Sequence, residues 1–190
     1  MTIKNSLIYI NQFFFFISNQ LRKIYLTSRI YNKRISKINL DQLVYKPSPS
    51  LLDCIIKYSA NKINISEFKF DKIWSKIDVN ENYSTESWNI ETLSKRIISW
   101  ISNSKITYEN SDLEYKKRFD RSINKQINHL INEIERSKLI DNQMVGCSAI
   151  ILSGLAYNDK KKILNYGIDF LKKINKYSFQ KDGFPKSRNI

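Results

Sequence analysis

The clearest hydrophobic pattern in the chain runs from Trp88 to Ser104. Its apolar residues recur at the three- and four-residue spacing that places side chains on one face of an α-helix: Ile90, Leu93, Ile97 and Ile101. Trp100 and Ile98 widen this apolar surface. The pattern predicts a helix that contacts neighbours on more than one side. We assign Trp88 and Trp100 to the core, and a sugar-stacking platform is the less favoured alternative for them.

A second helix is expected from Ser111 to about Ser137. Ser111 and Glu114 have the spacing of a capping box, in which the two side chains satisfy backbone donors at a helix start. His129 lies beside the apolar face of this helix, and we interpret it as a partly exposed or hydrogen-bonded structural histidine. That apolar face comprises Phe119, Ile123, Ile127, Leu130 and Ile134.

Two further helices are expected to follow through short turns. Asp141 is expected to cap a helix over Met144–Tyr157, and its apolar and small residues are typical of a helix buried on every side. Asp159 is expected to cap the last helix, whose inward face comprises Ile163, Gly167, Phe170, Leu171 and Ile174. Amphipathic, buried and amphipathic helices in this order predict antiparallel helical hairpins in two layers, and hence an all-α fold.

The N-terminal stretch Ser6–Ser18 contains four consecutive phenylalanines, from Phe13 to Phe16. The stretch is shorter than the roughly 20 apolar residues of a transmembrane helix, and Asn11 and Gln12 interrupt it. No small-residue cleavage site of a signal peptide follows. We therefore expect an amphipathic helix that lies on the rest of the protein. Peripheral attachment to a membrane surface is the less favoured alternative.

Basic and aromatic residues alternate between Arg22 and Lys37, a combination that can bind single-stranded nucleic acid. Isoleucines among them instead favour an ordinary helix with a solvated cationic face, namely Ile24, Ile30, Ile35 and Ile38. No nucleic-acid partner is therefore expected. Pro47 and Pro49 stop any preceding helix. We divide the chain there into an N-terminal amphipathic helical and basic segment (1–46) and a helical domain (47–190).

Composition agrees with one helical core. The chain has 190 residues, 42% of them hydrophobic, with four glycines and three prolines. These are too few for the many turns of a β-sandwich or barrel. The net charge of +14 leaves two explanations open. One is a polyanionic partner, and the other, favoured by the even spread of the lysines, is the amino-acid bias of an AT-rich genome.

Cysteine and histidine usage argues against a metal site. Cys54 and Cys147 form no C-x-x-C pair, and His129 is the only histidine, whereas a structural zinc site needs four ligands. Both cysteines have apolar sequence neighbours, which indicates small buried side chains. No metal or other cofactor is expected.

Four motifs in the second half resemble, in this order, the helical domain of the heparinase II/III family in its alphaproteobacterial branch. They are Arg96-Ile-Ile-Ser-Trp100, Gln126-Ile-Asn-His-Leu130, Ala149-Ile-Ile-Leu-Ser-Gly-Leu-Ala156 and Gln180-Lys-Asp-Gly-Phe-Pro-Lys-Ser-Arg-Asn189. The resemblance covers the second half of the chain, and residues 1–87 match only loosely. It implies an incomplete (α/α) toroid, followed in full-length members by a β-sandwich domain.

Enzymes of this family are polysaccharide lyases that cleave uronate-containing glycans by β-elimination. A basic group neutralises the uronate carboxylate, a base removes the C5 proton, and a tyrosine typically protonates the leaving oxygen. The resemblance therefore implies an acidic polysaccharide as the partner. It places the substrate-binding residues at Asn142, Gln143, Asp182, Lys186 and Arg188.

The chain departs from the family pattern at the reactive positions. Gln143 stands where many of these lyases have a histidine, and Pro185 replaces another common histidine. An amide cannot act as a general base, and the family tyrosine would follow Arg188, beyond the last residue. We therefore expect the N-terminal part of a longer lyase, cut within the toroid and inactive as this fragment. A non-catalytic helical scaffold or polyanion-binding module is the alternative. Structural roles also stay open, such as a cap for Asn142 or a turn at Gly183.

Overall fold

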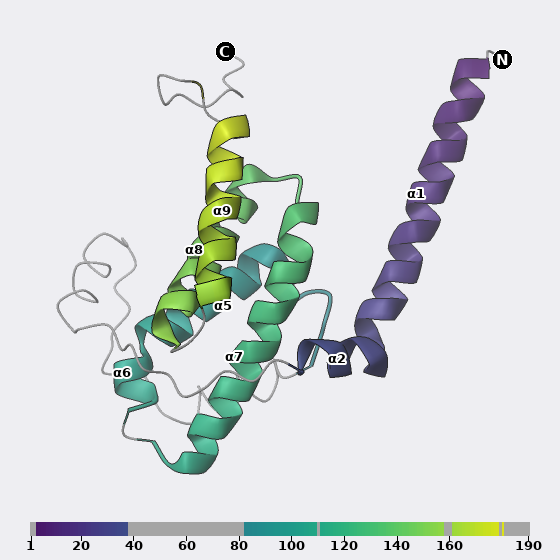
Figure 1. Cartoon of the computed structure of the whole chain (residues 1–190). Coiled ribbons are helices and arrows are strands. Elements are labelled where there is room, and N and C mark those ends of the chain that lie inside the picture. The colour runs from purple at the N-terminus through teal and green to yellow at the C-terminus, as the bar shows by residue number, and fades with distance from the viewer. Residues whose placement is uncertain (1–2, 38–81, 110, 158–160, 179, 181–190) are drawn as a thin grey trace.

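A computed structural model describes residues 3–37, 82–109, 111–157, 161–178 and 180. Within these ranges the chain is all-helical, as the sequence predicted (Figure 1). The helices are α1 (Ile3–Thr27), α2 (Arg29–Ile35), α5 (Ile90–Ser102), α6 (Ser104–Thr107), α7 (Leu113–Glu133), the 3₁₀ turn η2 (Ile134–Arg136), α8 (Ile140–Ala156) and α9 (Lys161–Ser178). The predictions for Ile38, Pro47, Pro49, Cys54, Asp159 and residues 181–189 lie outside the described residues.

Helix α5 lies at the centre of the core and packs against both α8 and α7. Asn89 caps its start, because the side-chain Oδ1 accepts a hydrogen bond from the backbone amide of Thr92 at 2.9 Å. The predicted apolar face is confirmed, although Ile90 is only half-buried. Both tryptophans are core residues, as predicted. The buried apolar residues of this region are Trp88, Leu93, Ile97, Trp100 and Ile101.

Helix α7 has a different cap from the one that the sequence predicted. Asp112 is the N-cap, with Oδ1 accepting from the Tyr115 amide at 2.7 Å. The Ser111 hydroxyl instead donates to the Thr107 carbonyl. Asp and Ser are about equally good caps, so the sequence did not separate them. The helix ends at Glu133 and η2 follows, one turn short of the predicted end. Its apolar face is buried as predicted: Phe119, Ile123, Ile127, Leu130 and Ile134.

Helix α8 begins earlier than predicted, and Asp141 does not cap it. Leu139 occupies the N-cap position without a side-chain hydrogen bond, and Asp141 lies in the first turn. The expectation of burial on every side is also wrong, since Ser148 and Leu155 are exposed. The helix packs against α9, α5 and α7, and these contacts leave one part of its surface in water. Its buried residues are Gly146, Cys147, Ala149, Ile150, Ser153 and Ala156.

Helices α8 and α9 form an antiparallel hairpin in which glycines permit a close approach. A Cβ atom at Gly154 would lie 2.6 Å from the backbone nitrogen of Leu164. A Cβ atom at Gly167 would lie 2.8 Å from Ile151 Cγ1. Gly154 thus contacts the earlier of the two α9 positions, and Ile151, which precedes it on α8, contacts the later one. This is the order expected of antiparallel helices. In Figure 1, α7, α8 and α9 run up, down and up, as the prediction of helical hairpins requires.

The phenylalanines of helix α1 are not buried against the rest of the protein, contrary to expectation. Figure 1 shows the helix standing beside the group formed by α5, α7, α8 and α9, called the bundle below. The side chains of Phe13 to Phe16 are each between 58% and 64% exposed. Among the described helices, none combines the length and the apolar content that crossing a bilayer requires.

Helix α2 attaches the N-terminal segment to α7. Ser28 caps it, and Tyr31 and Ile35 are its buried residues. Ile24 and Ile30 are exposed, so the apolar face expected between Arg22 and Lys37 is much narrower than the sequence indicated. The cationic face is solvated as expected, because its basic side chains are exposed, namely Lys23, Arg29, Lys33, Arg34 and Lys37.

Candidate functional site

Two of the predicted substrate-binding residues, Asn142 and Gln143, lie at the start of α8. Both are half-buried. Gln143 Nε2 donates a hydrogen bond to the carbonyl of Ser137 at 2.8 Å, across the turn between η2 and α8. This contact gives Gln143 a structural role, and it uses only the nitrogen end of the amide.

A hollow of about 280 Å³ opens beside Gln143, between η2, α8 and α9. Phe170 and Ile174 are buried in its lining, whereas Tyr177 is exposed at its edge. Lys173 Nζ lies 3.8 Å from Glu135 Oε1 and 5.8 Å from the centroid of the Phe170 ring. The hollow therefore combines an aromatic surface with a cation and a carboxylate. Its lining is Glu135, Ile140, Gln143, Phe170, Lys173, Ile174, Tyr177 and Ser178.

The other predicted site residues, Asp182, Lys186 and Arg188, lie outside the described residues. Ser178, the last residue of α9, lines the hollow, and the three residues follow it in sequence. Their approach to Gln143 stays a prediction.

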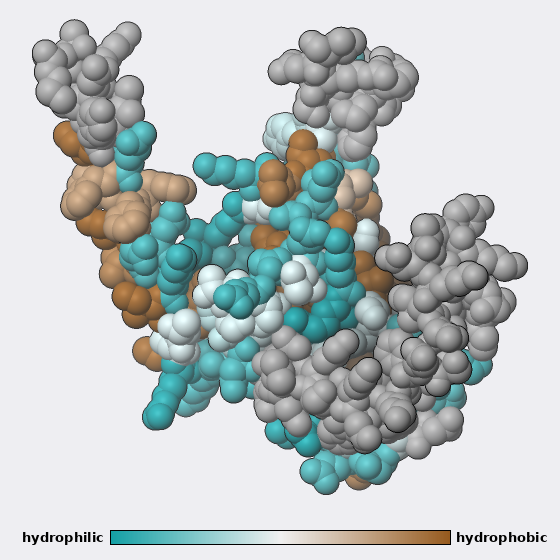
Figure 2. Space-filling view, turned by 180° about the vertical axis from the view of Figure 1, so that it is seen from behind, coloured by the Kyte–Doolittle hydropathy of each residue, from teal (hydrophilic) through white to brown (hydrophobic). Residues whose placement is uncertain are grey.

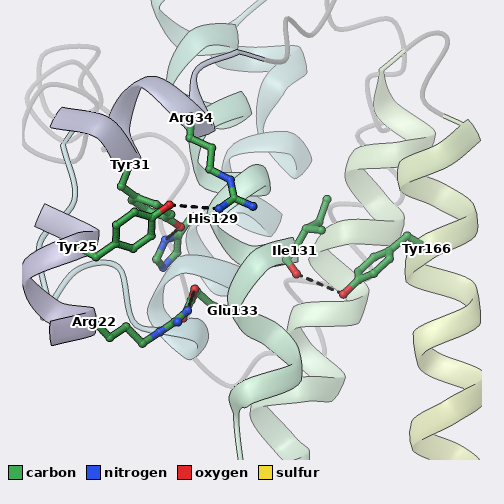
Figure 3. Close-up of polar contacts among 8 residues, drawn as sticks. All are labelled: Arg22, Tyr25, Tyr31, Arg34, His129, Ile131, Glu133 and Tyr166. Carbon is green, nitrogen blue, oxygen red and sulfur yellow. Dashed lines mark hydrogen bonds and ion pairs between the residues drawn. The ribbon is translucent and has the colours of Figure 1, made fainter. Parts of the chain in front are cut away.

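The described lining of the hollow suits binding better than proton transfer. Glu135 is the acid in this lining, and Lys173 is its ion-pair partner. Tyr166, one turn before Phe170 on α9, donates its hydroxyl to the Ile131 carbonyl at 3.3 Å (Figure 3). Burial raises the pKa of Tyr166 to about 12. That phenol therefore stays protonated and acts as a structural donor between α9 and α7.

Residues from two of the four motifs contact each other in the core. Arg96 Nε, from the first motif, donates to Gln126 Oε1 of the second motif at 2.8 Å. Arg96 Nη1 donates to the Ser87 carbonyl at 2.9 Å, and the guanidinium carbon lies 5.9 Å from the centroid of the Trp100 ring. Burial lowers the pKa of Arg96 to about 10, which leaves it charged at pH 7. These contacts tie α5 to α7, a role that the sequence did not indicate.

His129, from the second motif, is buried and hydrogen-bonded, in agreement with its interpretation as a structural residue. Its Nδ1 lies 2.7 Å from the Tyr31 hydroxyl (Figure 3), and the backbone of Trp88 is a further hydrogen-bond partner. Burial lowers the pKa of His129 to about 4, so the ring is neutral at pH 7. The neutral ring therefore has the Tyr31 hydroxyl and the Trp88 backbone as its hydrogen-bond partners.

A second hollow, of about 270 Å³, lies beside this histidine. The ring centroids of Tyr83 and Trp88 lie 5.3 and 5.2 Å from that of His129. Glu133 accepts a hydrogen bond from Arg22 Nε at 3.1 Å (Figure 3). Hydropathy spacing missed this cluster because its members come from α1, from α7 and from the residues before α5. The lining is Leu26, Tyr83, Thr85, Trp88, Asn89, Ile90, His129, Glu133, Arg136 and Ser137.

A half-buried carboxylate, Asp120 on α7, forms a third polar cluster that the sequence did not indicate. Its two oxygens accept hydrogen bonds from the hydroxyls of Tyr108 at 2.8 Å and Tyr157 at 2.9 Å. Burial raises the pKa of Asp120 to about 6, and the two tyrosine hydrogen bonds oppose this rise. Both tyrosines are buried, so the cluster joins α7 to the C-terminal end of α8.

Among the described residues, no group of three or more His, Cys, Asp or Glu side chains is placed to hold a metal ion. Comparison with protein-family models, curated proteins and solved structures gives no match for this chain. Fold and site together define an all-α protein with a partly aromatic, partly charged hollow at the end of its α8–α9 hairpin. Any assignment to a particular family rests on the four sequence motifs.

Proposed function

We propose that this chain is the N-terminal helical part of a heparinase II/III-like polysaccharide lyase, which cleaves uronate-containing glycans by β-elimination. The observation that carries the proposal is the contact between motif residues: Arg96 hydrogen-bonds to Gln126. His129, three residues after Gln126, hydrogen-bonds to the backbone of Trp88. Both contacts help to hold α5 and its preceding residues against α7. A fold shared with the family would explain why residues of these two motifs contact each other.

The proposed architecture is part of an incomplete (α/α) toroid. Such a toroid is built from antiparallel helical hairpins, and α7, α8 and α9 run in alternating directions (Figure 1). The close contact at Gly154 supports this arrangement, because it keeps α9 tight against α8. Helix α5, on another side of α8, would belong to the neighbouring hairpin of the toroid.

The proposed glycan site is the hollow beside Gln143. Lys173 offers a positive charge for a uronate carboxylate, and the exposed ring of Tyr177 offers a flat apolar surface for a sugar ring. Asp182, Lys186 and Arg188 are proposed to complete the site. Gln143 can hydrogen-bond to a substrate oxygen, but its amide cannot remove the C5 proton. Its proposed role is therefore positioning.

The binding part of this proposal is tested by calorimetric titration of the chain with a uronate-containing glycan and with an uncharged glucan. We expect the uronate glycan to bind and the glucan not to bind. Lys173→Ala should weaken binding about tenfold, as expected for one charge-assisted contact. Lys162→Ala, an exposed lysine on α9 outside the hollow, is the matched control. Equal weakening by the two substitutions would contradict a site at the hollow.

The catalytic part is tested by release of 4,5-unsaturated uronate, which is read by ultraviolet absorbance. We expect no release from the 190-residue chain, because neither Asn142 nor Gln143 is a general base. Release of product by this chain would contradict that reading of Gln143.

A non-catalytic helical scaffold or polyanion-binding module is the second candidate. The hydrogen bond that commits the Gln143 amide nitrogen to Ser137 favours it, and so does the positive charge spread over the chain. Affinity for heparin that survives the combined substitution Asn142→Ala and Arg188→Ala would support this candidate, since binding would then come from distributed charge.

A further inference from the structure

Helix α1 carries an apolar stripe that the rest of the protein leaves exposed. At 3.6 residues per turn, residues three, four and seven apart fall on one side of the helix. The stripe extends for about 21 Å at 1.5 Å per residue, and Figure 2 shows brown and tan surface along this helix. Its side chains, between 37% and 66% exposed, are Ile10, Phe13, Phe14, Ile17, Leu21 and Ile24.

The stripe faces a different direction from the contacts that α1 makes with the bundle. Arg22 pairs with Glu133, and Lys138 Nζ lies 5.3 Å from the centroid of the Phe15 ring. Arg22 and Phe15 both lie between about a third and a half of a turn away from the centre of the stripe. The helix therefore contacts the bundle on one side and presents the apolar stripe on another.

The N-terminal segment that carries the stripe is basic, and most of its cations follow the stripe in sequence. Residues 1–40 contain no Asp or Glu. The basic residues in this range are Lys4, Arg22, Lys23, Arg29, Lys33, Arg34 and Lys37. Of these, Lys23, Arg29, Lys33, Arg34 and Lys37 are exposed on α1 and α2 or directly after them.

We infer that α1 binds the surface of an anionic lipid bilayer, with the stripe in the acyl boundary and the basic residues at the headgroups. An interfacial helix has an apolar face that enters the lipid and cations that attract anionic headgroups. The apolar face and Lys23 are on α1, and Arg29, Lys33 and Lys37 are on α2 or directly after it. The polar residues opposite the stripe, Asn11 and Asn19 among them, stay in water in this orientation.

A second copy of α1 is a poorer occupant of the stripe. Pairing two copies would bring two sets of basic residues together with no carboxylate between them in residues 1–40. Like charges at such short range destabilise a helix pair. An anionic bilayer covers the same apolar side chains and neutralises the same cations, so charge complementarity favours the lipid surface.

Vesicle flotation of the full chain tests this inference. One set of vesicles is an equimolar mixture of phosphatidylcholine and phosphatidylglycerol, and the other is phosphatidylcholine alone. We expect the chain to float with the anionic vesicles and more weakly with the neutral ones, and binding to the anionic vesicles should fall as salt concentration rises. A chain that stays in the soluble fraction with anionic vesicles at low salt would overturn the inference.

Two substituted chains test the apolar contribution. Phe13→Ser combined with Phe14→Ser should lower partitioning into anionic vesicles by about a hundredfold, from the apolar area withdrawn from lipid. Leu139→Ser combined with Leu155→Ser is the control, because both leucines are more than half exposed but lie elsewhere. All four side chains are exposed, so both chains should keep the helical circular dichroism of the unsubstituted chain. Equal partitioning of the two substituted chains would overturn the inference.

The charge contribution has its own matched pair. Lys23→Glu, Arg29→Glu and Lys33→Glu together should lower partitioning by at least about a hundredfold. Lys117→Glu, Lys161→Glu and Lys162→Glu change the net charge equally at other exposed positions and should lower partitioning by less than about tenfold.

Sedimentation equilibrium tests whether a second copy of the chain covers the stripe instead. A dimer that Phe13→Ser with Phe14→Ser converts to monomer, in a chain that does not float, would assign the stripe to a second copy.

Discussion

The Tyr31 hydroxyl on α2 lies 2.7 Å from Nδ1 of His129 on α7, and both side chains are buried. The pair connects the N-terminal segment to the bundle across 98 residues of sequence. The ion pair of Arg22 with Glu133, one turn further along α7, strengthens the same connection.

Removal of the Tyr31 hydroxyl should destabilise the fold. Tyr31→Phe keeps the ring but leaves Nδ1 of His129 buried without its hydrogen-bond partner, which costs about 1–3 kcal/mol of unfolding free energy. Urea denaturation at pH 7 measures the loss. Tyr25→Phe is the control: the Tyr25 hydroxyl accepts only an exposed hydrogen bond from Arg34 at 3.2 Å, so its loss should change stability by less than about 0.5 kcal/mol. Equal losses in the two variants would contradict the assigned role of the pair.

His129 should make the fold more stable as the pH rises from about 4 to 6.5. The pKa of His129 is lowered from 6.5 to about 4 by burial, so the unfolded chain binds more protons in this window. The contribution is fully present above pH 6.5, is lost as the pH falls through 4, and amounts to about 3 kcal/mol. In His129→Gln this term disappears. Urea denaturation from pH 4 to 7 should then show that the unfolding free energy rises less steeply with pH than in the unsubstituted chain.

Asp120 should make the fold less stable as the pH rises over almost the same range. Its pKa is raised from 3.8 to about 6, chiefly by burial, so the folded chain binds more protons. The stabilising contribution is present below pH 3.8 and is lost as the pH rises through 6, by about 3 kcal/mol. Asp120→Asn removes this term, so stability should rise more steeply with pH than in the unsubstituted chain. A chain in which Asp120→Asn leaves the pH slope unchanged would show that this carboxyl does not titrate differently on folding.

The two pH terms oppose each other between pH 4 and 6 and should largely cancel in the unsubstituted chain. The doubly substituted chain, with His129→Gln and Asp120→Asn, serves as the reference for both slopes. Its pH dependence should lie between those of the two single variants.

Gly154 should tolerate no side chain, whereas Gly146 should tolerate a methyl group. A Cβ atom at Gly154 meets the backbone of Leu164 at 2.6 Å, and backbone cannot move aside without displacing α9. Gly154→Ala should therefore destabilise the fold by about 1–3 kcal/mol. At Gly146 the nearest atom is the Cδ1 of Ile134, also at 2.6 Å, and a rotation of that side chain relieves the contact. The higher helix propensity of Ala, worth about 1 kcal/mol, offsets the remaining cost of the contact with Ile134. Thermal denaturation of the two variants gives the comparison.

Local periodicity was sufficient to predict the faces of α5, α7 and α9. Ile97, Ile123 and Phe170 are buried where the spacing placed them, because a single apolar stripe has to face the core. The same reasoning failed for α8 and α1. Apolar spacing shows which side chains avoid water and does not show which neighbour covers them, so the exposure of Leu155 and Phe13 was not predictable.

Candidate site residues were predictable only where a motif carried them. Gln143 was found through the family resemblance, and the structure places it at a hollow with Lys173 and Tyr177. The partners of His129 and Asp120 were missed because they come from separate helices. Tyr31 is 98 residues from His129, and Tyr157 is 37 residues from Asp120. Contacts at such separations depend on how the helices assemble.

The glycine contacts of the α8–α9 hairpin also determine its register. Leu164 packs against Gly154, and Ile151 packs against Gly167. A slide of α9 by one turn, about 5.4 Å, would move both glycines away from these partners at once and bring larger side chains into collision. Only one alignment of the two helices satisfies both contacts. That alignment sets Lys173 and Tyr177 beside Gln143, so the geometry of the hollow depends on two glycines that do not line it.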